Sequence, residues 1–448
     1  MDYEQINIEN VCDDTVKKEE NKTQVIVVGG GPAGISCAIT IARAGMEVVL
    51  IERGKFSGSK NMFGGAIYAQ PTREIFPDFE TSAPLQRKNI EHKYALLGED
   101  DATVISYKNT KGDSYTVIRA EFDRWMADEA KKAGVILVEE TVVRELIVEN
   151  DCVKGVRTEI EDYYADIVVL ADGVNSLLAK QIGLRGDIKP EDVALSVKEV
   201  IKLDSEKIND RFHVNDDEGC VYEIFGGSML GMLGLGFMYT NKNSVSIGLG
   251  VTLSELAKYN LKPYDLLDKL KKHPQIAPLI KDGEMVEYSA HLIPEGGYKK
   301  IPRLCKSGVM VCGDAAMFVN NMHWEGTNLA MISGKFAGET AIMAIGKRDF
   351  SAETLSYYEQ LLENSFIIKD LRTYKDLMST AEVRAREFLG YYPEKINEFF
   401  EMFTTVDCIP KREKFRRFIK SIFKDRKISE LFKDGWAAVK LLWSILIK

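Results

Sequence analysis

The stretch QVIVVGGGPAGISCAITIARAGMEVVLIE, residues 24–52, decides the fold. Its apolar, Val-rich start over 24–29 predicts a buried strand, followed by a helix over 32–44 and a second strand over 47–51. The glycine-rich turn Gly29-Gly30-Gly31-Pro32-Ala33-Gly34 joins the first strand to the helix. A strand, a turn of this kind, a helix and a second strand together are typical of dinucleotide-binding domains.

The residues of this unit have separate expected tasks. Gly29 permits a tight turn, Gly31 lets the backbone approach a pyrophosphate, and Gly34 lets the helix pack closely on the strand. The helix N-terminus favours phosphate, and Glu52 can accept hydrogen bonds from ribose hydroxyls, which favours an adenosine without a 2′-phosphate. The motif alone leaves open NAD in place of FAD, and a structural turn without a ligand. The cofactor-binding residues predicted here are Gly29, Gly31, Pro32, Ala33, Gly34, Glu52 and Arg53.

Composition and charge restrict the class of protein. The chain has 448 residues, of which 45% are hydrophobic and 28% charged, as in ordinary globular enzymes. We find no apolar run long enough to span a bilayer and no secretory signal, so we expect a cytoplasmic protein. The net charge is −9, yet residues 411–448 hold twelve Lys/Arg against four Asp/Glu. An acidic body with a basic tail argues against nucleic-acid binding and favours contact with anionic lipid.

The seven cysteines do not form a metal-binding pattern. No two of them are separated by two residues, as metal and iron–sulfur motifs require, so we expect free thiols and no metal. Their positions are 12, 37, 152, 220, 305, 312 and 408.

Three further segments resemble the motifs of FAD-containing oxidoreductases of the p-hydroxybenzoate-hydroxylase type. They are TVIRAEFDRWM (116–126), VVLADG (168–173) and GVMVCGDAA (308–316). The resemblance implies that Asp314, after Gly313, holds a ribityl hydroxyl, that Arg119 lies along the FAD, and that Asp172 and Gly173 belong to the same site. The alternatives are a helix N-cap for Asp314 and a surface ion pair with Glu121 or Asp123 for Arg119.

A second strand-to-helix junction runs from Asn320 to Asn328 and precedes a predicted helix over 327–345. The N-terminal amides of that helix would point at the pyrimidine end of a flavin and favour its reduction. We assign Gly326, Thr327 and Asn328 to this role. His323 and Trp324 would lie near the ring as pocket residues, with simple packing as the alternative.

A closer resemblance is to FixC proteins and electron-transfer-flavoprotein:quinone oxidoreductases, over about residues 24–375. It is carried by SGSKNMFGGAIYAQP (57–71), FMYTNKNSVSIGLGV (237–251), HLIPEGGYKKIPRL (291–304) and the GDAA block. The resemblance implies FAD, electrons from the alpha and beta subunits of an electron-transfer flavoprotein, and a membrane quinone as acceptor. It also adds Lys60, Asn61, Gly64 and Gly65 to the cofactor-binding residues.

Two departures from the family pattern refine this reading. The mitochondrial-type quinone oxidoreductase carries a four-cysteine cluster near its C-terminus, whereas this chain has only Cys408 after Cys312. FixC proteins lack that cluster and work beside a ferredoxin-like iron–sulfur subunit, FixX, so a FixC-like subunit of a FixABCX complex fits better. Electron bifurcation, where it occurs, would belong to the partner flavoprotein. The second departure is Glu325, where close FixC relatives tend to have a basic residue.

The predicted organisation follows from these motifs. We expect an α/β fold, in which a Rossmann-like FAD-binding domain carries an inserted antiparallel-sheet domain and a helical C-terminal region. The expected parts are a flexible leader (1–22), a discontinuous FAD-binding domain (23–77, 115–190 and 300–350), a quinone sheet domain (78–114 and 191–299) and the helical region (351–448). We expect no clear element over 57–71, and only loops and short strands over 78–116.

The tail and one glycine-rich segment bear on the quinone and the membrane. Phe225–Tyr239 reads as a buried strand pair, with a few residues lining a pocket. Phe415, Phe418, Ile419, Ile422 and Phe423 share one helix face beside basic residues, which predicts peripheral contact with the inner face of the cell membrane. A pair of core or partner-packing helices is the alternative.

The sequence therefore predicts a flavoprotein in which the cofactor carries the chemistry and no acid–base residue is required. The enzymatic alternative is a geranylgeranyl reductase acting on prenyl lipids. The alternative from another class is a catalytically silent scaffold that docks partners on the membrane.

Overall fold

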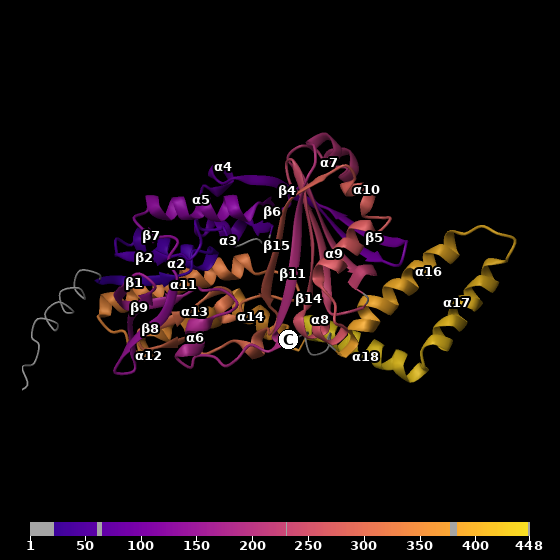
Figure 1. Cartoon of the computed structure of the whole chain (residues 1–448). Coiled ribbons are helices and arrows are strands. Elements are labelled where there is room, and N and C mark those ends of the chain that lie inside the picture. Colours follow the sequence, from indigo (N-terminus) through magenta and orange to yellow (C-terminus); the bar gives the residue numbers. More distant parts are fainter. Residues whose placement is uncertain (1–21, 61–64, 230, 377–382, 447–448) are drawn as a thin grey trace, which may run out of the picture.

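The computed structural model describes residues 22–60, 65–229, 231–376 and 383–446. Nearly all of the predicted leader, and the predicted site residues Asn61 and Gly64, lie outside these ranges. Figure 1 shows two sheets side by side, with helices α16 to α18 extending from the second sheet at the far end of the molecule.

The first sheet is built on the strand–helix–strand unit that the sequence predicts. Its central strands run in the order β17-β10-β1-β2-β7, and all four pairings are parallel. These strands are β1 (Lys22–Val28), β2 (Val48–Ile51), β7 (Ile136–Val138), β10 (Asp162–Leu170) and β17 (Val309–Val311). Antiparallel additions are β16 (Cys305–Lys306) beside β17, and β9 (Cys152–Thr158) with β8 (Val143–Glu149) beside β10.

Helices cover this sheet and complete its core. Helix α2 (Pro32–Arg43) packs against both α5 (Arg119–Lys132) and α11 (Thr327–Lys347). Gly334 makes the contact of α2 with α11 close, because a Cβ atom there would lie 2.0 Å from the carbonyl oxygen of Ala33. The predicted helices over 32–44 and 327–345 are confirmed.

The second sheet has nine strands in the described residues, in the order β15-β11-β14-β13-β12-β4-β6-β3, with β5 paired on β4. Only the β12–β4 pairing is parallel. The strands are β3 (Ala66–Tyr68), β4 (Leu85–Leu97), β5 (Ala102–Lys108), β6 (Ser114–Val117), β11 (Val193–Lys202), β12 (Glu218–Gly226), β13 (Gly234–Thr240), β14 (Ser244–Thr252) and β15 (Glu284–Pro294). Strands β3 and β6 come from segments that the sequence places in the dinucleotide-binding domain.

The two faces of the second sheet have different surroundings. Alternate residues of β12, such as Cys220 and Ile224, belong to a second hydrophobic core. Residues of α7, α8 and α9 contribute to that core. The helices on this side are α7 (Ser205–Phe212), α8 (Leu253–Tyr259), α9 (Pro263–Lys272) and α10 (Ala277–Ile280). The opposite face is left free to line a cavity.

Two segments differ from the sequence-based expectation. Residues 57–71, expected to lack regular structure, contain β3 and α3 (Ala69–Arg73), and residues 78–116 contain the 13-residue strand β4. Charged residues such as Arg87 interrupt the apolar pattern of β4. Arg87 is nevertheless buried, because its guanidinium donates to the backbone oxygens of Asn241 and Asn215, and such compensation is invisible in the local sequence. Two short helices, α4 (Phe79–Ser82) and α6 (Leu177–Gln181), complete this half of the chain.

The C-terminal region is helical, as predicted. Its elements are α12 (Ala352–Leu355), α13 (Tyr357–Asn364), α14 (Phe366–Thr373), the π-helical turn η5 (Glu387–Tyr391), α16 (Tyr392–Thr404), α17 (Lys411–Asp425) and α18 (Ile428–Leu446). In the described ranges, no helix has both the length and the apolar character needed to cross a membrane.

Candidate functional site

A cavity of about 880 Å³ lies between the first sheet and the free face of the second. Parallel strands present their carboxyl ends at one edge, so β1, β2, β10 and β17 bring Gly29, Glu52, Asp172 and Asp314 together there. The predicted residues that line the cavity are Gly29, Gly31, Pro32, Ala33, Glu52, Arg53, Lys60, Arg119, Asp172, Gly173, Asp314, His323, Trp324, Gly326 and Thr327. Gly34, Gly65, Gly313 and Asn328 are not among the residues that line it.

The glycine-rich turn leaves no room for side chains. Gly29 has φ +105°, and a Cβ atom on it would lie 2.3 Å from the carbonyl oxygen of Ala171. A Cβ atom on Gly34 would lie 1.9 Å from the carbonyl oxygen of Gly29. The turn therefore presents bare backbone and the start of α2 to the cavity, which suits a diphosphate.

Glu52 is held against this turn by two backbone amides. Its Oε2 accepts a hydrogen bond from Gly30 N–H at 2.7 Å, and its Oε1 accepts one from Gly54 N–H at 2.6 Å. The carboxylate therefore lies beside the turn, where an acceptor for ribose hydroxyls is expected.

Arg119 and Asp314 lie on neighbouring parts of the wall. Arg119 forms a buried two-point ion pair with Asp123, with distances of 2.7 and 2.8 Å. The surface ion pair that the sequence offered as an alternative is thus an internal one. Asp314 lies inside a short 3₁₀ turn (η4, Gly313–Ala316) and does not cap a helix with its side chain. Burial raises its pKa to about 6, although Arg119 opposes that shift.

Asp172 is a second buried carboxyl of the cavity. Its Oδ1 atom has no hydrogen-bond partner among the described residues. Burial raises its pKa to about 6, against hydrogen bonds from backbone amides and the charge of Arg185. An orphaned acceptor of this kind fits a ligand that brings hydroxyl or amide donors into the cavity.

The junction before α11 reaches across to the second sheet. The Trp324 ring lies 5.8 Å from the ring of Phe225, and His323 Nε2 lies 3.1 Å from the hydroxyl of Tyr374. Gly326 occupies the N-cap position of α11, so the free amides of that helix open toward the cavity. Asn328 is buried and donates to Glu325 Oε2 at 3.2 Å.

The free face of the second sheet supplies residues that the sequence analysis did not single out. Side chains alternate across a strand, so Val221, Glu223 and Phe225 of β12 all face the cavity. A charged residue at an inward position of an alternating strand was the sequence feature that could have revealed Glu223. The other residues missed on this wall are Tyr68, His92, Tyr239, His291 and Glu295.

Four of these missed residues have shifted pKa values: Tyr68, Tyr239, His291 and Glu295. Burial raises the pKa of Glu295 to about 8, so this carboxyl is largely protonated at neutral pH. Burial, with Arg119 and Arg53 nearby, lowers the pKa of His291, so its imidazole is neutral at pH 7.

The glycine-rich segment 225–239 is both a strand pair and a cavity wall. Strands β12 and β13 pair as predicted, and Phe225, Leu235 and Phe237 face the cavity. Gly248 makes room for the Phe237 ring, because a Cβ atom there would lie 2.4 Å from it. This end of the cavity is aromatic and apolar.

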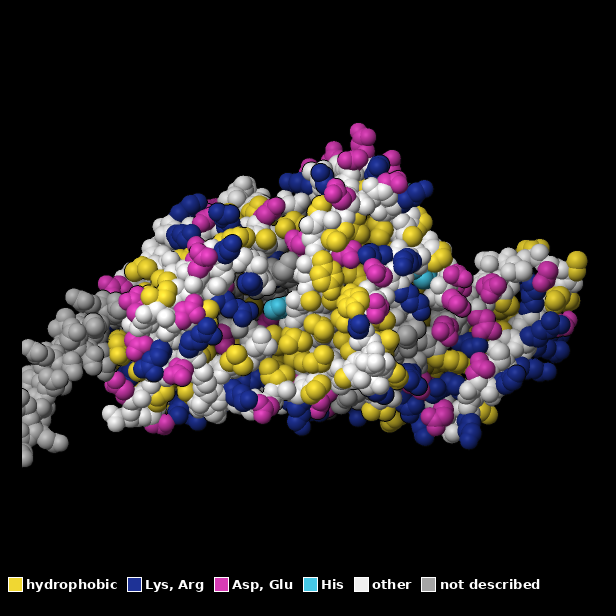
Figure 2. Space-filling model, viewed as in Figure 1, with side chains coloured by type: hydrophobic (Ala, Val, Ile, Leu, Met, Phe, Trp, Pro, Cys, Tyr) yellow, Lys and Arg dark blue, Asp and Glu magenta, His cyan; other side chains and the backbone are white. Residues whose placement is uncertain are grey.

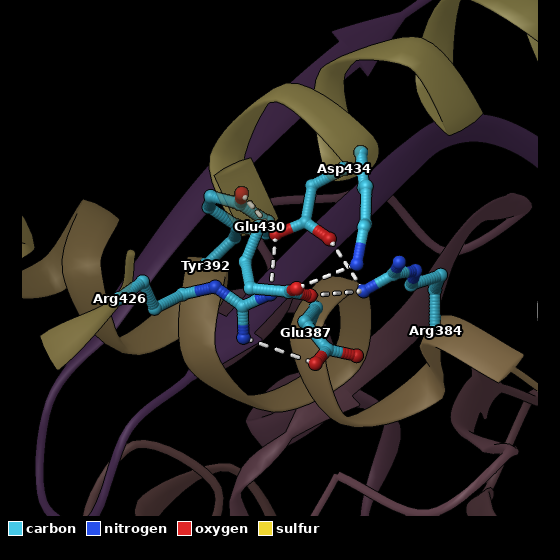
Figure 3. Close-up of polar contacts among 7 residues, drawn as sticks. Arg384, Glu387, Tyr392, Arg426, Glu430 and Asp434 are labelled. Atoms are coloured by element: carbon cyan, nitrogen blue, oxygen red, sulfur yellow. Dashed lines mark hydrogen bonds and ion pairs between the residues drawn. The ribbon is translucent and has the colours of Figure 1, made fainter. Parts of the chain in front are cut away.

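The C-terminal helices are tied to the same apolar end. Phe388 and Leu389 of the π-helical turn line the cavity. Figure 3 shows the ion-pair network beside them, centred on Asp434 of α18. The Asp434 side chain is 1% exposed and lies 3.0 Å from Arg384 and 2.7 Å from Arg426, and the Tyr392 hydroxyl donates to it at 2.9 Å.

The helices α17 and α18 expose large apolar side chains of a kind that is usually buried in the core of a soluble protein. Trp436 is 72% exposed and Phe432 75%. Figure 2 shows Lys and Arg side chains gathered over α17 at the right-hand end of the molecule. Of the predicted apolar face, Phe415, Ile419 and Phe423 are exposed, and both Phe415 and Phe418 contact the ring of Phe399 on α16.

Comparisons with known families agree with this geometry. Residues 22–217 match an FAD-binding domain family, residues 193–293 match the ubiquinone-binding domain of ETF-QO, and residues 377–443 match the C-terminal domain of the ETF-QO/FixC family. The cavity described above is shared by the first two matched ranges, and its apolar end reaches the third.

Individual proteins point the same way. The chain is 42% identical to protein FixC of Bradyrhizobium diazoefficiens over 93% of its own length and 98% of that protein. It is 38% identical to the probable electron transfer flavoprotein-quinone oxidoreductase YdiS of Escherichia coli, over 93% of this chain and 98% of that protein. A geranylgeranyl bacteriochlorophyll reductase-like structure from Thermoplasma acidophilum superimposes with a TM-score of 0.71 at 21% identity, over 92% of this chain and 98% of that one. At that identity the likeness is one of fold.

Proposed function

The chain belongs to the ETF-QO/FixC family of FAD-binding oxidoreductases, and on that premise we propose that it takes electrons from an electron-transfer flavoprotein and delivers them to a membrane quinone. The observation that carries the proposal is the single cavity that joins the glycine-rich turn of the first sheet to the aromatic face of the second. A cofactor held at one end would meet a quinone held at the other.

The residues present fit FAD on three structural grounds. The turn at Gly29 and Gly34 admits no Cβ atom, Glu52 lies beside it, and Asp172 keeps an unpartnered buried oxygen. We propose that the turn binds the diphosphate, Glu52 the ribose, Asp314 the ribityl chain, and the N-terminus of α11 the pyrimidine end of the ring. Lys60, Arg119, Gly65, Gly173 and Asn328 would support these contacts. Bound FAD supplies the capacity to hold two electrons and to exchange them singly or in pairs.

The quinone would occupy the apolar end of the cavity. Phe237 and Tyr239 stack with their ring centroids 5.0 Å apart, and Phe388 and Leu389 add apolar surface from the C-terminal region. Flat aromatic walls suit a planar quinone ring. The match of residues 193–293 to a ubiquinone-binding domain supports this placement.

We further propose partners and a location. In the described residues no group of three or more His, Cys, Asp or Glu side chains could hold a metal ion. Iron–sulfur chemistry would therefore come from a FixX-like subunit, and electrons from the alpha and beta subunits of an electron-transfer flavoprotein. The basic α17 and the exposed tryptophans of α18 suit the anionic inner face of the cell membrane.

The test is anaerobic electron transfer with purified protein. We expect a yellow protein whose cofactor is reduced by its electron-transfer flavoprotein and reoxidised by a short-chain ubiquinone. Purification from native membranes should bring along a small iron–sulfur subunit. Reduction of prenyl-lipid double bonds with NADPH by this chain alone would instead establish the reductase alternative, and colourless protein the scaffold alternative.

A further inference from the structure

Glu223 is a carboxylate in an otherwise aromatic part of the cavity. It projects from β12 beside Phe225 and Phe237, and its side chain is 15% exposed. Its buried Oε2 atom has no hydrogen-bond partner among the described residues. Such a group in a site that takes a quinone requires an explanation, because leaving it unsatisfied costs stability.

A partly exposed histidine of β4 lies beside it. His92 Nδ1 lies 3.7 Å from Glu223 Oε1, and the His92 side chain is 34% exposed. In the strand register His92 pairs with Tyr107 of β5, which is 60% exposed. Glu223, His92 and Tyr107 thus follow one another along the free face of the second sheet, from the cavity to an exposed strand.

We propose that Glu223 donates protons to the quinone in the cavity and that His92 reloads it from water. This inference rests on the proposed function. It departs from the expectation, drawn from the sequence, that no acid–base residue is needed.

The stoichiometry of the reaction requires such a path. Reduction of a quinone to its hydroquinone takes up two electrons and two protons. Electrons handed over by a protein donor bring no protons with them, so both protons come from water during one turnover. In each cycle His92 gives a ring proton to the Glu223 carboxylate and takes another from water. The O–H bond so formed on Glu223 breaks as an O–H bond forms on a quinone oxygen, and the electrons come from the reduced cofactor. The cycle runs twice, once for each of the two quinone oxygens.

Two tyrosines and three other carboxyl groups of the cavity are less suited to the task, and Glu295 is compared with Glu223 directly in the experiment below. Burial raises the pKa values of Tyr68 and Tyr239, and the negative charge of Glu223 raises them further, so both remain neutral hydroxyls. Asp172 and Asp314 lie at the strand ends of the first sheet, and Glu325 accepts from Asn328. The titratable groups that face Glu223 are His92, Tyr94, Tyr68 and Tyr239.

The experiment uses the flavin-loaded full chain, reduced beforehand and mixed with ubiquinone-1 in a stopped-flow instrument. At saturating quinone and pH 7 we expect Glu223→Gln to slow reoxidation by about 100-fold or more, the usual loss when a proton donor is removed. Quinone affinity, measured by quenching of flavin fluorescence, should change by less than about threefold because the side chain keeps its shape. Glu284→Gln is the matched control, since Glu284 is exposed on the same sheet and does not line the cavity.

A second variant tests the order of the relay. His92→Ala should also slow reoxidation, and added imidazole should restore it in proportion to concentration, while Glu223→Gln stays unresponsive. The control is His213→Asn, at an exposed site outside the cavity. Each of four results would overturn the inference. Glu223→Gln could reoxidise at the wild-type rate, or lose only quinone affinity. Glu295→Gln could slow reoxidation in place of Glu223→Gln, or imidazole could fail to rescue His92→Ala. Failure of the wild type itself to reduce quinone would instead refute the proposed function.

Discussion

The guanidinium of Arg119 and the carboxylate of Asp123 form a two-point ion pair inside the protein, with Nε–Oδ1 and Nη2–Oδ2 distances of 2.7 and 2.8 Å. Asp123 is completely buried and lies one helical turn after Arg119 on α5. Arg119 itself lines the cavity. The pair fixes the position of the arginine that the family resemblance places along FAD. It also makes that position sensitive to a residue outside the cavity.

Replacing Asp123 should therefore cost both stability and cofactor. Asp123→Ala leaves the buried Arg119 without this partner, a change that costs about 3–5 kcal/mol in comparable sites. We expect a lower melting temperature and a lower ratio of flavin to protein absorbance. Glu121→Ala, on the exposed side of the same helix turn, is the control and should leave both unchanged. Full flavin content and stability in Asp123→Ala would contradict the role of the pair.

The close approach of α2 to β1 predicts a steric effect at Gly34. A Cβ atom in Gly34→Ala would lie 1.9 Å from the carbonyl oxygen of Gly29, so the glycine-rich turn must move. We expect loss of FAD retention, measured as absorbance near 450 nm after gel filtration. Gly186→Ala introduces the same atom where nothing lies within 4 Å and should bind FAD normally. A yellow, stable Gly34→Ala protein would show that this packing is not needed.

Removing the ionisable carboxyl of Asp314 should have opposite effects on the stability of the apoprotein and on FAD binding. Burial raises the pKa of its carboxyl from the ordinary 3.8 to about 6, so the folded state holds this proton more tightly than the unfolded state. Between these two pH values the apoprotein loses stability as pH rises, and above pH 6 the unfavourable contribution of about 1–3 kcal/mol is fully present.

Asp314→Asn should consequently make the apoprotein more stable at pH 7.5 and leave it unchanged near pH 4. FAD affinity should fall, because the proposed acceptor for a ribityl hydroxyl is lost. Thermal unfolding of apoprotein at both pH values, with a flavin-binding titration, measures the two effects. An apoprotein destabilised at pH 7.5 would contradict the sign of this argument.

The network in Figure 3 predicts local rather than global loosening. Asp434→Ala removes the carboxylate that pairs with both Arg384 and Arg426, and leaves each of these partly buried cations with one carboxylate partner, Glu430 or Glu387. We expect faster hydrogen exchange in α18 and over 383–392, while the first sheet keeps its protection. Lys433→Ala, which removes an exposed pair with Glu430 on the same helix, is the control. Unchanged exchange in α18 would mean that the network does not hold the helix.

The membrane proposal is best tested by point substitutions. Deletion of the tail would also remove Asp434 and unbalance Arg384 next to the cavity, so its effects would be mixed. Trp436→Ser with Trp443→Ser changes only exposed side chains, 72% and 58% accessible. Flotation of this double variant with anionic vesicles should fall several-fold while its flavin content stays constant. The control is Val406→Ser, a change at an exposed loop residue, which should float like wild type. Equal flotation of the double variant would refute the contact.

The sequence by itself determined the parts of this protein that depend on local spacing. The strand, the glycine-rich turn and the helix over 24–52 follow from short-range sterics, because Gly29 and Gly34 each face a carbonyl oxygen that excludes a Cβ atom. Asp172 and Asp314 were predicted from the resemblance to FAD-containing oxidoreductases. The structure places both at the ends of parallel strands, which share one functional edge.

Only the tertiary structure decided which face of the second sheet closes the cavity. Strand β4 was missed because the charge of buried Arg87 is balanced by carbonyl groups more than a hundred residues away. Glu223 and His92 are separated by 131 positions in the sequence, and the parallel pairing of β12 with β4 brings them together. Asp434 likewise gains Arg384 and Tyr392 as partners only when α18 folds back onto residues 384–392. Long-range pairing of this kind depends on the packing of the whole chain, and no local pattern encodes it.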